Sequence, residues 1–201
     1  MKYLLKIMLI LLVFLPSCRS SKPVAKTYYV IEFPGERAKD SQPLLLPYSL
    51  EISTVDIHPV FATHQIAVRE NDHEIRYFSN HEWAVRPKES FTRFVHDYFN
   101  QKGLFRNVNV RFWSLRPDYR LVTRINNLEV LVEGRDYYAR LQIEFRLIME
   151  QGEVLIVQHS ADRTRLLEKR NLNLFTGAIN DIFYEELHYF AGMIIHDFTH
   201  E

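Results

Sequence analysis

The chain has 201 residues, of which 47% are hydrophobic and 13% aromatic, and this composition is typical of a folded globular protein rather than a disordered one. Its 25 lysines and arginines balance 25 aspartates and glutamates, so no strong positive field favours binding to nucleic acid. The sequence contains no Gly-x-x-x-x-Gly-Lys loop, no dinucleotide fingerprint and no Gly-x-Ser-x-Gly elbow. We therefore expect no nucleotide hydrolysis, no bound cofactor and no nucleic-acid partner.

A short apolar leader begins the chain and ends at Cys18, the only cysteine. Lys2 and Lys6 make its start positively charged, and its apolar run is too short to span a bilayer as a helix. Such a segment is typical of a secretory signal, and its last four residues fit a bacterial lipobox apart from Pro16. We predict that residues 1–17 are a lipoprotein signal peptide and that acyl chains on Cys18 hold the mature protein in a membrane. The alternatives are a plain secretory signal with a chance cysteine, or an uncleaved anchor.

The segment that begins at Cys18 is polar, which predicts an acylated tether over residues 18–26. Residues 27–201 are numerous enough for one domain with one hydrophobic core. Because no second cysteine is present, no disulfide can form within the chain, and burial must stabilise this domain.

The first part of the domain contains runs of aromatic and β-branched residues that are bounded by proline, glycine, asparagine or aspartate. Such runs predict strands. The predicted strands are residues 28–33, 50–57, 66–70 and 74–78, and a predicted loop at 36–47 separates the first two. The sequence Asn71-Asp72-His73 is suited to a turn, so the last two strands are predicted to form a hairpin.

Residues 87–101 are the clearest predicted helix. Its apolar residues recur at helical spacing and make one stripe; they are Phe91, Phe94, Val95, Tyr98 and Phe99. Pro87 suits the first helical position, and Gly103 suits a left-handed residue after the last turn.

The second half of the domain has the pattern of a long β-meander. Alternation with a period of two predicts strands at residues 108–112, 119–132, 138–149 and 154–164. In the second of these strands the alternation changes phase at Asn126-Asn127, which predicts a β-bulge. Apolar residues occupy one side of these strands, so the sheet has one core face and one solvated face.

A long helix is predicted at residues 174–198, capped by Asn171 or Asn173 and weakened locally by Gly177 and Gly192. Strands followed by amphipathic helices indicate an α+β fold. We predict a two-layer domain in which two amphipathic helices pack on one face of a mainly antiparallel sheet.

Charged residues along the predicted strands give no sign of catalysis. Asp118, Asp136 and Asp162 alternate with arginines, as on a solvated sheet face, and do not have the pattern of a general acid–base pair. We therefore predict that the protein is not an enzyme.

Two histidines near the end of the chain have the spacing of metal ligands. His196 and His200 would lie on one helix face, but Asp197 stands where a zinc hydrolase needs a glutamate. A polar helix end is the favoured interpretation, and His196 and His200 are weak candidates for a metal site.

Two aromatic residues before the first helix are candidates for partner binding. Trp83 precedes the helix that begins at Pro87, and its favoured role is a core aromatic that joins the hairpin to that helix. The alternative is that Trp83 is an exposed anchor for a lipid or a protein, with Tyr77 as the second candidate.

Several short motifs occur in one order along the chain. They are the lipobox at Cys18, Tyr28-Tyr29-Val30-Ile31, Ile66-Ala67-Val68-Arg69, Ile75-Arg76-Tyr77, Trp83-Ala84 before Pro87, and Asp118-Tyr119-Arg120-Leu121. In this order and spacing, over residues 15–198, the chain resembles the ABC-type transport auxiliary lipoproteins. These include the lipoprotein of the paraquat-inducible Mce-type system.

The resemblance implies a non-catalytic α+β domain in the Gram-negative periplasm, tethered to a membrane through Cys18. It implies partners: an ABC permease, an ATPase and an MCE-domain protein that move lipids across the envelope, or copies of the chain itself in a ring. Arg19, which is not an aspartate, predicts the outer membrane by analogy with enteric lipoprotein sorting. The alternatives are a lipoprotein activator of a cell-wall synthesis enzyme, and a membrane-bound hydrolase with unrecognised catalytic residues.

Overall fold

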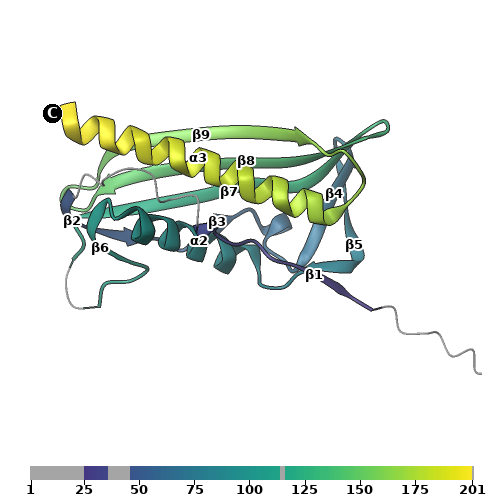
Figure 1. Ribbon diagram of the computed structural model, residues 1–201, viewed down its shortest axis with the longest axis horizontal. Helices are drawn as coiled ribbons and strands as arrows, with labels where there is room; N and C mark the ends of the chain where they lie inside the picture. The colour runs from purple at the N-terminus through teal and green to yellow at the C-terminus, as the bar shows by residue number, and fades with distance from the viewer. Residues whose placement is uncertain (1–24, 36–45, 114–115, 201) are drawn as a thin grey trace, which may run out of the picture.

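The computed structural model describes residues 25–35, 46–113 and 116–200, and these residues form an α+β fold (Figure 1). In chain order the elements are β1 (Thr27–Tyr29), β2 (Leu46–Ile52), β3 (Asp56–Ile57), the 3₁₀-helix η2 (Pro59–Phe61), β4 (Gln65–Asn71), β5 (Glu74–Trp83), α2 (Pro87–Lys102), β6 (Phe105–Asn109), β7 (Tyr119–Glu133), β8 (Asp136–Met149), β9 (Val154–Leu166) and α3 (Leu172–His200). Cys18, the predicted signal peptide, and most of the predicted tether and first loop lie outside the described residues.

β7 is the central strand of the sheet, and its neighbours run in different directions. β2, β3 and β4 are parallel to β7, each beside a different part of its length. The pairs β1–β5 and β2–β6 are also parallel, whereas β4–β5, β7–β8 and β8–β9 are antiparallel. The sheet is therefore mixed, and the prediction of a mainly antiparallel sheet is wrong.

The directions of the strands could not be predicted from the alternation of apolar and polar residues. A period of two shows which side of a strand is buried, but it carries no information about the direction of the neighbouring strand. The strands that precede α2 reach β7 through a connection that contains the whole of that helix, and parallel pairing needs such a crossover. Only the pairs joined by tight turns could be oriented from the sequence.

The hairpin of β7 and β8 carries the middle of the core face. The register of β7 against β8 shifts between Ile125 and Asn127, which confirms the predicted bulge. Leu128 and Val130 are buried like Ile125, although their positions have the opposite parity. The extra residue therefore keeps the apolar side chains of both halves of β7 on one face.

α2 confirms its prediction, with one additional residue at its end. Pro87 lies in its first turn, and Gly103 follows its last residue with φ of 62°. The backbone N–H of Gly103 donates to the carbonyl of Phe99 at 3.1 Å, which closes the helix with a left-handed residue. All five residues of the predicted stripe are buried.

α3 confirms the second predicted helix and begins two residues earlier. The side-chain oxygen of Asn171 accepts hydrogen bonds from the backbone N–H groups of Asn173 at 2.7 Å and Leu174 at 3.3 Å, so Asn171 is the cap. The helix lies along β8 and β9 (Figure 1). There Phe190 stacks on Phe145 of β8, with ring centroids 5.3 Å apart.

Phe183 of α3 contacts aromatic rings of both α2 and β8. Its ring centroid lies 4.6 Å from that of Phe91 and 4.8 Å from that of Phe94, both on α2. It also lies 5.8 Å from Phe145 of β8. Tilted and edge-to-face rings at these distances attract each other beyond simple burial, so this cluster joins both helices to the sheet.

Several predicted strands differ from the structure in extent, and β5 continues five residues beyond the predicted 74–78. β1 ends at Tyr29, although the buried Ile31 follows it. The strand predicted at residues 50–57 is divided between β2 and β3. β6 ends at Asn109, where its pairing with β2 ends, so the alternation that continues from Val108 to Phe112 runs on into a loop.

Candidate partner-binding site

β9 lies at an edge of the sheet. Among the described residues it pairs with β8 alone, along nearly its whole length from Val154 to Leu166. The backbone N–H and C=O groups on its other side therefore have no strand partner in that part of the chain. A strand edge of this kind can pair with an additional extended segment.

The two halves of β9 differ in charge. The first half, residues 154–160, contains no lysine, arginine, aspartate or glutamate, and exposes Val154 and Leu155. The second half, residues 161–166, contains Asp162, Arg163 and Arg165. Charged side chains are a common means by which proteins prevent unwanted edge pairing, so the first half is the open part of this edge.

Ion pairs close the second half of β9 against α3. Glu186, which is 4% exposed, lies 2.5 Å from the Nε atom of Arg163 and 2.6 Å from the ring of His159. Farther along, Arg165 lies 2.8 Å from Glu185 of the same helix. These contacts hold strand and helix together at that end.

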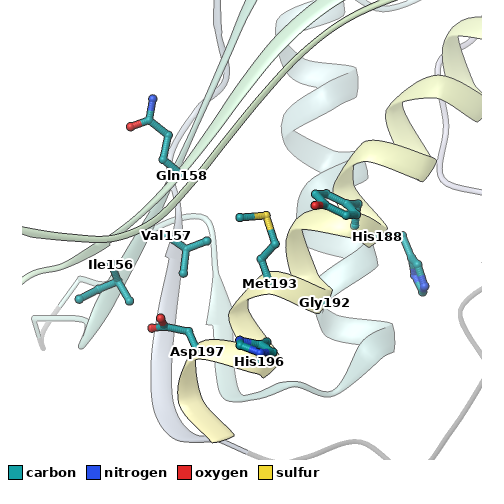
Figure 2. A pocket seen from close by; sticks show the side chains of 9 residues that line it. Ile156, Val157, Gln158, His188, Gly192, Met193, His196 and Asp197 are labelled. Carbon is teal, nitrogen blue, oxygen red and sulfur yellow. The ribbon is translucent and has the colours of Figure 1, made fainter. Parts of the chain in front are cut away.

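A groove separates the first half of β9 from the C-terminal part of α3 (Figure 2). It has a volume of about 680 Å³. The residues that line it are Ile156, Val157 and Gln158 of β9 and His188, Tyr189, Gly192, Met193, His196 and Asp197 of α3. Figure 2 shows Met193 extending from α3 toward the strand, beside Val157.

Gly192 leaves part of this groove open. A Cβ atom built on Gly192 would meet no heavy atom within 4 Å. Ile156, on the opposite wall, is the extra residue at a register shift between β8 and β9, because Leu147 pairs with Val157 and Ile148 with Leu155. The groove can accept an apolar side chain beside an edge that can accept a backbone, which suits an extended peptide.

Trp83, the first predicted partner-binding residue, is in the core. Its side chain is 2% exposed, and its ring lies 5.9 Å from that of Phe175 on α3. This position fits the interpretation of Trp83 as a core aromatic rather than as an exposed anchor.

Tyr77, the second predicted partner-binding residue, is on β5 and is 38% exposed. Its hydroxyl donates to the carbonyl of Val60 in η2 at 3.0 Å. Tyr77 therefore presents part of its ring to solvent while its hydroxyl fixes η2 against the hairpin, away from the β9 groove.

His196 and His200 lie together near the end of α3, with ring centroids 4.4 Å apart. His196 also lines the groove, and both side chains are exposed. Within the described ranges, no three side chains of His, Cys, Asp or Glu are grouped closely enough to hold a metal ion.

The solvated face of the sheet contains one buried acid, Glu129 of β7. The Nε atom of Arg69 lies 3.0 Å from each of its carboxylate oxygens, and Asn127 donates to it at 3.0 Å. Arg140 lies 3.5 Å from it and also binds Asp162 at 2.8 Å. With its oxygens occupied by these donors, Glu129 joins β4, β7 and β8 as a structural ion pair.

Sequence reasoning did not find the open half of β9, the groove or the buried acids. Two signals for them were present. The uncharged run at residues 154–160 is visible in the sequence, and Glu186 lies between Phe183 and Phe190 on the apolar stripe of the final helix. A charged residue on a buried stripe predicts a partner, but its partners Arg163 and His159 are set by the tertiary structure.

Over the residues that the structure describes, no helix combines the length and apolarity needed to cross a membrane. The family model described as the ABC-type transport auxiliary lipoprotein component matches residues 29–173, well over half of the chain. This match begins in β1, includes every later strand and ends at the start of α3.

Solved structures are similar in fold. Protein XCC0632 from Xanthomonas campestris, assigned to the DUF330 family, has a TM-score of 0.68 and 15% identity, over 87% of this chain and 95% of its own. A second solved structure, of an uncharacterized protein, has a TM-score of 0.67 and 13% identity, over 85% of this chain and 99% of its own. Among curated proteins, none matches significantly. At these identities the structures show the shared fold, while the family model covers most of the sequence: the chain belongs to the ABC-type transport auxiliary lipoproteins.

Proposed function

We propose that this protein is a non-catalytic auxiliary subunit that binds an extended segment of a partner subunit of an ABC transport system along the first half of β9. Membership of the family supports the transport role. The observation that carries the proposal is the uncharged open edge at residues 154–160 beside the groove, because the two features together match the backbone and side chains of an added strand.

We further propose that the transport system is of the Mce type, with an MCE-domain protein, an ABC permease and an ATPase, and that it moves lipids across a Gram-negative envelope. The mature chain would be anchored through acyl chains on Cys18 at the periplasmic face of the outer membrane. The motif order that runs from Cys18 to Asp118-Tyr119-Arg120-Leu121 supports this assignment.

An apolar side chain of the partner would enter the groove between Met193 and Ile156, while the backbone of the partner pairs with β9. Backbone pairing supplies affinity that is largely independent of sequence, and the groove selects the side chain. The second half of β9 would not take part, since Arg163 and Arg165 are bound to α3 there.

The groove is tested by filling it in the full-length chain, in cells, with cross-linking and affinity recovery of partners. Gly192→Leu places a large side chain in the groove, and we expect it to reduce recovery of the transport partner at least tenfold. Gly177→Leu is the matched control, because Gly177 is also exposed on α3, a Cβ there also meets no heavy atom within 4 Å, and it lies outside the groove. Equal recovery by both variants would contradict docking at the groove.

The edge is tested by adding charge to it. Leu155→Lys places a cation on the open half of β9, and Leu166→Lys places one on the half that already carries charges; both leucines are exposed. Only the first substitution should reduce recovery of the partner.

The choice of partner is tested by what the wild-type chain recovers. We expect an MCE-domain protein, and we expect deletion of the gene to give the same envelope-lipid or detergent-sensitivity defect as deletion of the permease. Recovery of a cell-wall synthase alone, without an envelope-lipid phenotype, would favour the role of enzyme activator instead. Recovery of other copies of the chain alone would assign the edge to self-assembly.

Anchoring is tested separately by mass spectrometry of the mature protein. The expected N-terminus is an acylated Cys18, and Cys18→Ala should prevent both acylation and cleavage at that site. An unmodified cysteine in membrane-extracted protein would contradict the anchor.

A further inference from the structure

Another cavity lies between α2 and the segment that follows β1, and it has a volume of about 430 Å³. The segment that forms one of its walls is held at both ends. The carbonyl of Tyr29 accepts a hydrogen bond from the backbone N–H of Ala84 at 2.8 Å, and the side chain of Gln101 on α2 donates to the carbonyl of Gly35. The cavity is therefore bounded by a segment that is tied to its neighbours.

The inner surface of the cavity is apolar. Ile31 and Phe94 line it and are buried, and the ring of Phe33 meets that of Phe94 edge to face, with centroids 5.5 Å apart. Val30 and Val85 also line the cavity but are exposed, so they stand at its mouth. The cavity thus suits an apolar stem that enters from solvent.

One buried polar group faces this apolar surface. Ser90 of α2 lines the cavity and is 8% exposed, and its hydroxyl makes no hydrogen bond to any residue that the structure describes. The nearby hydroxyl of Thr92, by contrast, donates to the carbonyl of Lys88 at 2.7 Å and accepts from the backbone N–H of Val55 at 2.9 Å. A buried hydroxyl without a partner costs free energy, which a ligand with a matching polar group recovers.

Two exposed carboxylates line the cavity, Glu32 on one wall and Glu89 on the other. Over the described ranges, neither takes part in an ion pair or a hydrogen bond. The remaining charged groups of the lining bind each other, because Arg93 lies 3.5 Å from Asp97, which is also 3.1 Å from the ring of His96. The charge that remains available to a ligand is therefore negative.

We propose that this cavity binds a lysine side chain from an extended segment of a protein partner. The methylene stem would lie against Phe33 and Phe94, as long cationic side chains pack along apolar surfaces. The ammonium group would donate to the two available carboxylates and to the hydroxyl of Ser90. The exposed valines at the mouth would contact the residues beside the lysine, which a free amine lacks. This site is separate from the β9 groove, so the inference goes beyond the function proposed above.

A lysine fits the chemistry of the cavity better than an apolar side chain or a metal ion does. An apolar side chain would fill the volume but leave the hydroxyl of Ser90 without a partner. A metal ion would leave the apolar walls uncovered, and in the described part of the chain no group of three His, Cys, Asp or Glu side chains could hold one.

The experiment measures the binding of short peptides to the full-length chain in micelles of an uncharged detergent by isothermal titration calorimetry. The probes are the tripeptide Leu-Lys-Leu and its matched control Leu-Gln-Leu, both blocked at their ends. We expect the lysine peptide to bind about tenfold more tightly, because only its side chain carries a charge. Glu89→Gln should weaken its binding roughly fivefold, and Ser90→Ala roughly threefold.

Two further variants control this test. Glu32→Gln, on the other wall, should weaken binding as Glu89→Gln does, so the result does not depend on one variant of α2 that might lose its fold. Glu168→Gln removes an exposed acid outside the cavity and should leave the affinity unchanged. Equal binding of the two peptides, or binding of neither at millimolar concentration, would overturn the proposal. So would an equal loss with Glu168→Gln and Glu89→Gln, because it would assign the binding to the charge of the whole surface.

Discussion

The two halves of β9 differ in how they contact α3. Along the second half, α3 is held to the strand by Glu186 and Glu185, which bind Arg163 and Arg165. Along the first half the strand carries no lysine, arginine, aspartate or glutamate; His159 at its end still contacts Glu186, and a groove of about 680 Å³ lies between residues 156–158 and α3. One strand can therefore be tied to a helix by buried ion pairs at one end and border a groove against the same helix at the other.

The largest difference between the halves should appear in core packing. Phe183→Ala, in the closed half of α3, removes a ring that contacts three others, and should lower the free energy of unfolding by about 3–5 kcal/mol. Met193→Ala, in the open half, removes a partly exposed side chain and should cost about 1 kcal/mol. Urea denaturation of both variants measures this. Equal losses would mean that the groove is packed as tightly as the core.

The ion pairs of the closed half should give the next effect. Glu186→Gln keeps the size of the side chain but removes its charge from Arg163 and His159, and should cost about 1.5–3 kcal/mol because the carboxylate is buried. Glu185→Gln is the matched control; its side chain is 58% exposed, so the loss should stay below about 1 kcal/mol. If thermal melting gives the same loss for both, burial does not strengthen the contact of Glu186.

Alkaline pH should test the contact between Tyr98 of α2 and the C-terminal part of α3. The hydroxyl of Tyr98 on α2 lies 3.1 Å from His188 of the groove, and burial raises the pKa of Tyr98 above its ordinary value of 10.0. The folded state therefore keeps the proton after the unfolded state has lost it, and this contribution to stability falls as the pH rises above about 10. We expect Tyr98→Phe to lose less stability than the wild type between pH 8 and pH 11, by about 1 kcal/mol.

Parallel declines of the two proteins in urea denaturation at those pH values would contradict the raised pKa of Tyr98. The other tyrosines are common to both chains, so their ionisation cancels in the comparison. A difference that appears already at pH 8 would report the lost hydrogen bond to His188 rather than ionisation.

The smallest effect should come from the two glycines of α3. Gly192→Ala and Gly177→Ala each replace a poor helix former where the new methyl group meets no heavy atom within 4 Å, so each should raise the free energy of unfolding by about 0.5–1 kcal/mol. Melting temperatures of the two variants provide the measurement. Stabilisation at Gly177 with loss at Gly192 would mean that the groove is already filled.

The sequence predicted those features that depend on near neighbours in the chain. The stripe of α2, its proline start and its left-handed Gly103 follow from helical spacing and backbone freedom, and all are confirmed. The bulge at Asn126-Asn127 followed from a change of parity, because a strand whose core face is buried cannot change phase without an extra residue. The family, too, followed from the order of short motifs, and the family model confirms it.

The tertiary structure decided what depends on distant segments. The parallel placement of β2, β3 and β4 beside β7 comes from the crossover through α2. The alternation of apolar and polar residues within a strand carries no information about this placement. Among the residues that the structure describes, β9 pairs with β8 alone, which leaves its edge open, and Arg163 and Arg165 bind acids on a helix that follows later in the chain. A local pattern fixes which face of an element is apolar, but the partner that covers this face is chosen by the whole fold, so the candidate site could be located only in three dimensions.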